Sequence, residues 1–511
     1  MKTKTNITNI FFAITFFVVF LNIFFYCKLS NSKENNEEFR VGMEANYPPF
    51  NWTQNLNSKE SAKIQDSNQF AGGYDVMISN SIAAKLNKKL IIVKTEWDGL
   101  IPALISKKID AIVAGMSPTQ SRKEIIDFSD NYYVSDLVIL VKKGSKYENA
   151  KNLHEFCNSK ITAQLNTLHY KIIDQIPNVY KQKAMENFPS MRVALESGII
   201  DGYVTEKPEA TTAEILNKNF KMVEFVKEEG FEIKNDEEST IAIGLRKNDP
   251  ILSEINKTLS EISEDEKKIF MYEAMKNQPV KKINKNWFLQ ILKENGLQLL
   301  RGACTTLFIS LVSTIVGAFI GISIEIIRTA EQPENTFAQL IFKIFLWTTS
   351  TYVEIFRGTP MIIQLVVFYY GTAQIFGFDM NKMIAALIVV SINTGSYMTE
   401  IFRGAMKAID NGQFEAAKAI GIPHFRSMKK IILPQVIRNS LPLIGNEFVI
   451  NLKDTSVLNI ISVSELFFEA KTIAGQNFHF FQTFFIVSII YFVMTFSVTQ
   501  LLRKLEQKLN N

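Results

Sequence analysis

The sequence is poor in the residues that bind metals or build disulfide frameworks. Its 511 residues include three cysteines, Cys27, Cys157 and Cys304, which lie in different segments and form no C-x-x-C pair. Neither a disulfide framework nor a zinc site is therefore predicted. The four histidines are equally scattered, and we interpret all of them as structural: His154, His169, His424 and His479.

Patterns for nucleotide chemistry and nucleic-acid binding are also absent. No G-x-x-x-x-G-K-[ST] loop, which cradles nucleotide phosphates, occurs in the chain, so we expect it not to bind and hydrolyse ATP in the usual manner. No cofactor is predicted to be bound by this chain. The net charge is only +5 and no basic tract is interleaved with aromatic residues, so nucleic acid is not an expected partner. No catalytic triad or metal set can be assembled, and the chain is not expected to be an enzyme.

Hydrophobic residues are abundant and are segregated along the chain. They make up 47% of the composition and include 40 Phe, while 21% of all residues are charged. Lys2 and Lys4 precede an apolar stretch over 10–27, which predicts a signal peptide or membrane anchor within 1–33 and places the following chain outside the cytoplasm. The expected order is then a polar domain over 34–280, a basic linker over 281–295 and a membrane domain over 296–511.

The polar region is typical of an α/β domain. Short apolar strands at 39–43, 90–93 and 111–114 alternate with amphipathic helices such as 75–86. Closing helices are predicted over 251–276.

The apolar region predicts an all-α membrane domain of about five helices. Residues 403–438 carry seven Lys or Arg against two acids, which places this loop in the cytoplasm by the positive-inside rule. The number of spans is consistent with a cytoplasmic basic loop only if the shorter apolar stretch 337–353 does not cross the membrane and lies in the base of the bundle or at the interface. The predicted spans are 302–327, 359–377, 382–402, 440–462 and 480–502.

The basic loop contains a specific motif in the run EAAKAIGIPHFRSMKKIILPQ. It resembles the EAA loop of the permease subunits of bacterial ABC importers, and the stretch YVEIFRGTP at 352–360 resembles their polar amino-acid branch. A short helix that is stopped by Gly421 and Pro423 would form a compact knob. The resemblance implies that this knob fits a socket on the ATPase subunit, whereas an ordinary helical hairpin is the alternative. The residues assigned to this coupling are Glu415, Ala416, Ala417 and Gly421.

The resemblance also implies partners and a location. ATP and magnesium would be bound by a separate cytoplasmic ATPase dimer, and the permease would form a homodimer or heterodimer within membrane lipid. The chain would be an integral protein of the bacterial inner membrane, with its α/β domain extracytoplasmic and its EAA loop and C-terminus cytoplasmic. Polar residues in or beside spans mark the transport pathway or pair structurally: Asn393, Glu400, Asn446, Glu447 and Lys453.

Five motifs in the α/β region resemble the family 3 extracellular solute-binding proteins that feed amino-acid importers. The resemblance implies a type II periplasmic-binding-protein clamshell, with lobe 1 about 38–133 and 240–280, lobe 2 about 137–222, and crossovers near 133–138 and 222–242. The motifs are RVGMEANYPPFNW at 40–52, GGYD at 72–75, WDGLIPAL at 97–104, IDAIVAGMSPTQSR at 109–122 and DFSDNYY at 127–133.

A free amino acid presents a carboxylate and an ammonium that a dehydrated cleft must pair. Arg122 offers a bidentate fork for the carboxylate. The resemblance places the carboxylate-binding arginine there, with Gly115 and Ser117 helping to hold the α-ammonium. It also implies that Glu206 is the acid for the ammonium, although many members have Asp at this position.

Further ligand contacts are expected from a turn in the second lobe and from an aromatic wall. The turn at 163–167 resembles the ligand-clamping turn of the family, which assigns Thr167 and, as an additional candidate, Asn166, where Gly is common. The ligand side chain should face Glu44, Tyr47 and Trp97, with Asp75 behind them as a second additional candidate.

An acid among aromatic faces favours a cationic side chain, so arginine, lysine or histidine is the predicted ligand. Two alternatives stay open within this interpretation. Glutamine can be held by similar groups, and Trp97 can be a core aromatic. A different class, an amino-acid-gated membrane receptor or sensor, joins the same clamshell to membrane helices, but the EAA loop favours an importer.

Overall fold

The computed structural model describes residues 37–134, 136–226, 229–232, 240–278, 286–330, 332–333, 335–377, 380–477 and 479–510. The predicted signal or anchor within 1–33 and the first residues of the predicted linker lie outside these ranges. The described chain forms two compact units. One contains the residues up to Gly296 together with Ala470–Ile486, and the other contains Leu297–Glu469 together with the chain from Val487 onward.

The first sheet of the N-terminal unit is built around β1. Strand β1 pairs in parallel with β6 and β7, and β14 is antiparallel to β7 and β8. Its strand order is β6 (Lys89–Lys94), β1 (Glu38–Met43), β7 (Ala111–Ile112), β14 (Thr240–Leu245) and β8 (Asp127–Val134).

A second five-stranded sheet forms the other lobe, and a small sheet extends the first. Strand β9 lies between β12 and β13 and is antiparallel to both. The second sheet has the order β11 (Tyr180–Lys181), β10 (Lys160–Thr162), β12 (Gly202–Glu206), β9 (Leu137–Lys142) and β13 (Phe220–Val223). The small sheet has the order β2 (Asn46–Tyr47), β3 (Asn51–Gln54), β5 (Phe70–Gly72) and β4 (Ala62–Lys63).

The chain passes between the two five-stranded sheets where β8 leads into β9 and where β13 is followed by β14. These crossovers confirm the predicted two-lobed α/β class. The predicted helices are present as α2 (Tyr74–Lys85), α8 (Ile251–Glu261) and α9 (Glu264–Asn277). Helix α9 begins with a capping box between Ser263 and Glu266, which satisfies backbone donors at both positions.

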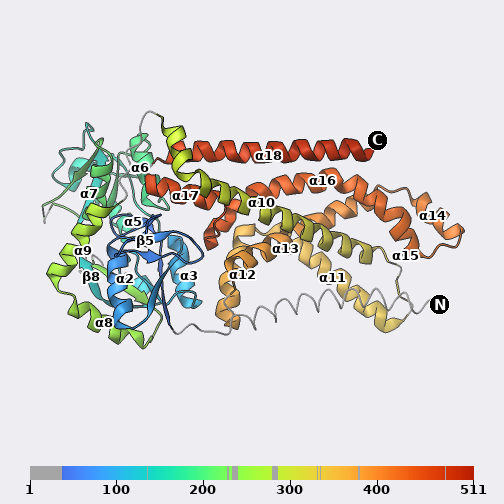
Figure 1. The fold of residues 1–511 in the computed structure, drawn as a ribbon, viewed down its shortest axis with the longest axis horizontal. Helices are drawn as coiled ribbons and strands as arrows, with labels where there is room; N and C mark the ends of the chain where they lie inside the picture. Colours follow the sequence, from blue (N-terminus) through green and yellow to red (C-terminus); the bar gives the residue numbers. More distant parts are fainter. Residues whose placement is uncertain are drawn as a thin grey trace. The chain divides into compact units, whose positions relative to one another are not determined.

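The C-terminal half is helical, as predicted, and α13 packs against α11, α12 and α16 (Figure 1). Helix α10 already begins inside the stretch predicted as a linker. The long helices are α10 (Trp287–Arg328), α11 (Thr336–Gly358), α12 (Met361–Phe376), α13 (Lys382–Lys407), α16 (Leu433–Asp454) and α18 (Phe480–Asn510), with α17 (Leu466–Asn477) before the last.

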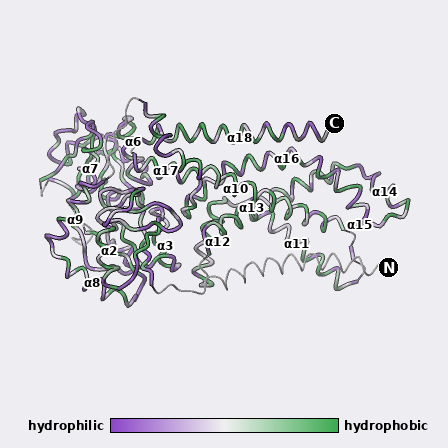
Figure 2. The backbone as a smooth tube through the Cα atoms, in the orientation of Figure 1, coloured by the Kyte–Doolittle hydropathy of each residue, from purple (hydrophilic) through white to green (hydrophobic). Residues whose placement is uncertain are grey.

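Three of the described helices, α10, α13 and α18, are long and apolar enough to cross a membrane. Helices α11 and α12 also pass together but are bent by 110°, so the number is up to four if this pair is one span. The bend falls at Thr359 and Pro360, where proline cannot continue the hydrogen-bond ladder of a helix. Hydrophobic residues dominate α10 and α13 in Figure 2, whereas the C-terminal end of α18 is hydrophilic. The count of five spans stays a prediction.

Two of the polar residues predicted to mark a pathway or a pairing are paired in the structure. The amide of Asn393 donates to the carbonyl of Phe356 at 3.1 Å and to Gln364 at 3.0 Å. Glu400 accepts from Nε of Arg403 at 2.9 Å. A structural contribution from both residues is therefore present, and a role in the pathway stays a prediction.

Candidate ligand-binding site and coupling loop

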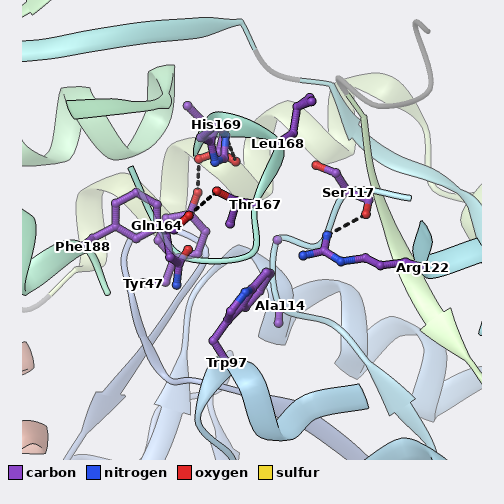
Figure 3. Close-up of a pocket in the computed structure, with 12 residues that line it drawn as sticks. Tyr47, Trp97, Ala114, Ser117, Arg122, Gln164, Thr167, Leu168, His169 and Phe188 are labelled. Carbon is purple, nitrogen blue, oxygen red and sulfur yellow. Dashed lines mark hydrogen bonds and ion pairs between the residues drawn. The ribbon is translucent and has the colours of Figure 1, made fainter. Parts of the chain in front are cut away.

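A pocket lies between the two five-stranded lobes of the N-terminal unit (Figure 3). Seven of the eight predicted ligand-binding residues line it, and Glu44 is the exception. Its lining residues are Tyr47, Trp97, Ala114, Gly115, Ser117, Arg122, Gln164, Thr167, Leu168, His169, Phe188 and Glu206.

Arg122 supplies the positive charge of the pocket. It lies on the short helix α4 (Gln120–Lys123), and its side chain donates to the carbonyls of Ser117 at 2.9 Å and Asn166 at 2.8 Å. Its Cζ is 5.2 Å from the centroid of the Trp97 ring, so the guanidinium also makes a cation–π contact. Burial lowers the pKa of Arg122 to about 10, which keeps it charged at neutral pH.

Glu206 supplies the negative charge at the end of β12, where it precedes α7 (Lys207–Leu216). Its Oε1 lies 3.0 Å from Nε2 of His169, and its Oε2 accepts a hydrogen bond from the Tyr47 hydroxyl. Burial alone would raise the pKa of Glu206, but the charge and the hydrogen bond of His169, together with Tyr47, lower it below its usual value. The pocket therefore holds an ionised carboxylate opposite a guanidinium.

The ring of Tyr47 is fixed by aromatic neighbours on both sides. It stacks on Phe50 with centroids 4.9 Å apart and on Phe188 with centroids 4.5 Å apart. Gly115 approaches the same ring with a φ of +63°, and a Cβ at this position would lie 2.7 Å from Cε1 of Tyr47. Only glycine fits this backbone position without moving the ring.

Asp75 lies behind the pocket rather than in its lining. Its carboxylate accepts from the Tyr132 hydroxyl at 2.8 Å and from the Asn51 amide at 2.8 Å, and the same hydroxyl accepts from the backbone N–H of Gly115 at 3.2 Å. Burial raises the pKa of Asp75 to about 6. Asp75 thus supports the Gly115 turn through Tyr132.

Glu44 is buried next to the lining residue Gln164, whose amide donates to its Oε2 at 3.3 Å. Its Oε1 has no hydrogen-bond partner among the described residues. Burial, aided by the carboxylate of Glu96, raises the pKa of Glu44 to about 8. This carboxylate would be stabilised by a cation or a hydrogen-bond donor at Oε1.

The turn in the second lobe contains a residue with a left-handed backbone. Asn166 has a φ of +57°, which asparagine tolerates better than most residues. Its carbonyl accepts from Arg122, and its amide donates to Asp98 at 3.0 Å, so it lies against the first lobe without lining the pocket. The Thr167 hydroxyl donates to the carbonyl of Gln164 at 2.6 Å.

Sequence reasoning missed five lining residues: Ala114, Gln164, Leu168, His169 and Phe188. His169, interpreted from the sequence as a structural histidine, lies in the pocket lining with its imidazole against Glu206. Its position two residues after Thr167 was a usable signal. Phe188 begins α6 (Phe188–Glu196), far along the chain, and only the fold brings it to Tyr47. Trp97 lines the pocket and is only half-buried, so it is not simply a core aromatic.

Two family models match the chain in its two halves. Residues 39–290 match the bacterial extracellular solute-binding proteins, family 3, and residues 336–511 match the binding-protein-dependent transport system inner membrane component. The arginine transport system permease protein ArtQ of Bacillus subtilis (strain 168) is 32% identical over 213 residues, which cover 42% of this chain and 93% of that protein. This chain belongs to the binding-protein-dependent inner membrane transport components.

Proteins similar to this chain are named for different amino acids. The glutamine transport system permease protein GlnP of Escherichia coli (strain K12) is 31% identical over 212 residues, covering 41% of this chain and 92% of that protein. An ancestral arginine-binding protein bound to arginine is similar to the N-terminal part, with 31% identity, a TM-score of 0.38, and coverage of 46% of this chain and 97% of that one. The two family models and the two permease relatives show that the chain is a polar amino-acid ABC transporter fusion of a binding domain and a permease, and neither matched family is an ATPase.

The EAA motif of this permease forms two short helices. Helix α14 (Asn411–Ala419) is capped by Asp410, whose side chain accepts from the N–H of Gly412 at 2.7 Å. Gly421, with a φ of +73°, ends the turn before α15 (His424–Ser427), and a five-residue π-helical segment, Met428–Ile432, leads into α16.

One face of the motif is buried and the other is open to solvent. Ala417 is buried, whereas Glu415 and Ala416 are exposed and Ile420 is 73% exposed. Below it, a cluster of buried side chains joins the π segment to α13: Met398, Phe402, Ala405, Met406, Ile409, Met428, Ile432 and Val436. The open face, with an acid beside an apolar side chain, suits contact with a partner protein.

Proposed function

We propose that the pocket binds one free amino acid, preferentially with a cationic side chain, and delivers it to the permease half of the same chain. The observation that carries the proposal is that an ionised Glu206 and the cation Arg122 line the same pocket. An α-amino acid carries one carboxylate and one ammonium, and these two residues complement them. The Arg122 fork would exchange its two carbonyl acceptors for the two carboxylate oxygens, which are stronger partners.

Selectivity for a cationic side chain rests on Glu44. A buried carboxylate with an unpartnered oxygen is costly, and a guanidinium, ammonium or imidazolium would reduce that cost by ionic hydrogen bonding. The aromatic rings of Tyr47 and Trp97 would add cation–π contact, worth roughly 0.5 to 2 kcal/mol. The existence of a relative named for arginine supports this ligand class.

Glutamine is the second candidate ligand. A protonated Glu44 together with Gln164 can donate to and accept from a side-chain amide, and relatives named for glutamine transport match the permease half. A cationic side chain would favour an ionised Glu44, whereas the neutral amide of glutamine would favour a protonated Glu44. The ionisation of Glu44 in the complex therefore distinguishes the two candidate ligands.

The exposed EAA knob would transmit the work of a separate ATPase dimer, which binds ATP and magnesium. Glu415, Ala416 and Gly421 are exposed on it, while Ala417 is buried. A second permease subunit would complete the translocation path. The knob would face the cytoplasm and the binding domain the outside of the inner membrane, in accord with the basic charge of 403–438.

The test is calorimetric titration of the purified full-length chain in lipid nanodiscs with each of the twenty amino acids. We expect micromolar or tighter binding of arginine, lysine or histidine. Tight binding of glutamine alone would retain the importer and contradict the role of Glu44 as a cation site. Binding of none of the twenty would contradict the assignment of the pocket.

A further inference from the structure

A histidine occupies the place in the pocket where a ligand cation is expected. His169, on α5 (Leu168–Ile172), lies with Nε2 3.0 Å from Oε1 of Glu206. The side chains of His169 and Glu206 are 8% and 4% exposed, so water screens this pair weakly. Nδ1 of His169 has no hydrogen-bond partner among the described residues. Glu206 is therefore the group that stabilises a positive charge on this imidazole.

The charged and titratable groups near this pair include other acids, and Glu206 is the acid that contacts the His169 imidazole. Glu206 also accepts from the Tyr47 hydroxyl, which is neutral. Glu209, one turn along α7, is already paired with Arg192 at 2.6 Å and accepts from Tyr203 at 3.1 Å. Arg122 also lines the pocket, Asp75 and Tyr133 act on Glu206 through space, and Glu44 lies outside the lining, against Gln164.

We infer that His169 is a positioning residue that couples amino-acid binding to proton release: its protonated form competes with the α-ammonium of the ligand for Glu206. The inference rests on the proposed function, because it assumes that Glu206 receives the ammonium. With His169 charged, a bound ligand would place two cations beside one buried carboxylate. Like charges in a buried site repel strongly, so binding favours loss of the imidazole proton.

The neutral imidazole keeps a useful role after the proton leaves. With its remaining hydrogen on Nε2, it still donates to Glu206 and orients the carboxylate without opposing the ammonium. Amino-acid affinity then increases with pH until His169 is fully neutral. Low pH weakens binding, and it does so for every amino acid, because the competition concerns the α-ammonium and not the side chain.

The dependence on the α-ammonium of the ligand separates the effect of His169 from that of Glu44, whose pKa burial raises to about 8. Ionisation of Glu44 affects ligands with a cationic side chain, whereas the charge on His169 affects glutamine and arginine alike. Neither probe titrates between pH 5.5 and 7.5, so the comparison reports on the protein.

The experiment is titration calorimetry of the full-length chain in nanodiscs with L-glutamine and L-arginine at pH 5.5 and 7.5. Each titration is run in two buffers of different ionisation enthalpy, which counts the protons released. His169→Gln keeps a hydrogen-bond donor without titrating, and His169→Lys keeps a permanent cation. His154→Gln, at an exposed histidine of the same lobe, is the matched control.

For the unaltered chain we expect Kd to rise about tenfold from pH 7.5 to 5.5, since histidine changes charge within this range. For glutamine, His169→Gln should remove this rise and the proton release at pH 5.5, whereas for arginine the part of the rise that is due to Glu44 should remain. His154→Gln should retain both the rise and the proton release. His169→Lys should bind weakly at both pH values. An equal pH dependence in the unaltered chain and His169→Gln, or binding without proton release, would overturn the inference alone. Binding of neither amino acid at pH 7.5 would overturn the proposed function as well.

Discussion

The charged residues of the pocket already have partners within the protein, and a bound ligand would replace some of them. The carbonyls of Ser117 and Asn166 hold the Arg122 guanidinium, and His169 and Tyr47 hold the Glu206 carboxylate. The net gain on binding is then the difference between two sets of hydrogen bonds, which favours ionised ligand groups over neutral ones.

Replacing Arg122 tests the carboxylate site. Arg122→Ala removes the only buried fork opposite Glu206 among the lining residues, and loss of a buried charged partner costs about 2 to 5 kcal/mol. We expect Kd for the preferred amino acid to rise by about two orders of magnitude or more by calorimetry. Arg122→Lys should bind more weakly than the unaltered chain because lysine lacks the planar fork. Unchanged affinity in both variants would contradict this assignment.

Glu44 provides a pH-dependent test of stability. Its pKa in the folded chain, about 8, lies above the ordinary value of 4.5, so its contribution to folding is complete below about pH 4.5 and is lost as the pH rises through 8. Glu44→Gln should therefore raise the thermal unfolding midpoint of the binding unit relative to the unaltered chain at pH 9 more than at pH 5. The variant should also lose affinity for arginine and keep affinity for glutamine. An equal change in midpoint at both pH values would contradict a buried, titrating Glu44.

The sequence predicts that a residue lies in the pocket when the local motif around that residue determines its backbone position. Arg122, Gly115 and Glu206 lie within motifs that determine their own backbone, and the structure brings them to one pocket. Glu44 lies against the lining residue Gln164 and outside the lining itself, and its contact with the ligand stays a prediction. Phe188 depends on long-range packing, which no local pattern contains.

At the scale of elements, strands and amphipathic helices followed from apolar periodicity. Strand β7 ends at Ile112, earlier than predicted, and the N–H of Val113 still donates to the carbonyl of Gly42 in β1 before the chain reaches the Gly115 turn. The predicted span over 440–462 is interrupted: α16 ends at Asp454, and a 3-10 segment covers Thr455–Ile461. Because hydropathy is averaged over a window of residues, it does not reveal where a helix is interrupted within a span. The position of this break is known only from the structure.

The turn of the EAA knob depends on one glycine. Gly421 has a φ of +73°, and a Cβ there would meet nothing within 4 Å, so a substitution would cost backbone strain but no packing. A left-handed conformation costs other residues roughly 1 to 2 kcal/mol, and asparagine less. We expect Gly421→Val to lower amino-acid uptake severalfold at unchanged ligand affinity, and Gly421→Asn to retain most of it. Equal uptake by both variants would contradict a requirement for this turn.

At the scale of the whole molecule, the order of a binding domain and a permease on one chain was readable from sequence. Two motif sets fall in separate halves, and each half folds as its motifs indicated. Fusion keeps a binding domain near its permease at an effective concentration on the order of millimolar, which removes a diffusional search. Relatives of the permease half are named for arginine transport and for glutamine transport, and we propose that side chains of the binding pocket decide which amino acid is carried.

The most direct measurement is uptake of radiolabelled arginine and glutamine by cells that lack the chromosomal copy of this chain. The cells are complemented with the unaltered chain, with Arg122→Ala or with Glu415→Lys, and each is assayed with and without depletion of ATP. We predict ATP-dependent uptake with the unaltered chain, loss of uptake and of binding with Arg122→Ala, and loss of uptake with retained binding in Glu415→Lys. Uptake restored by both variants, or uptake that persists without ATP, would contradict the account.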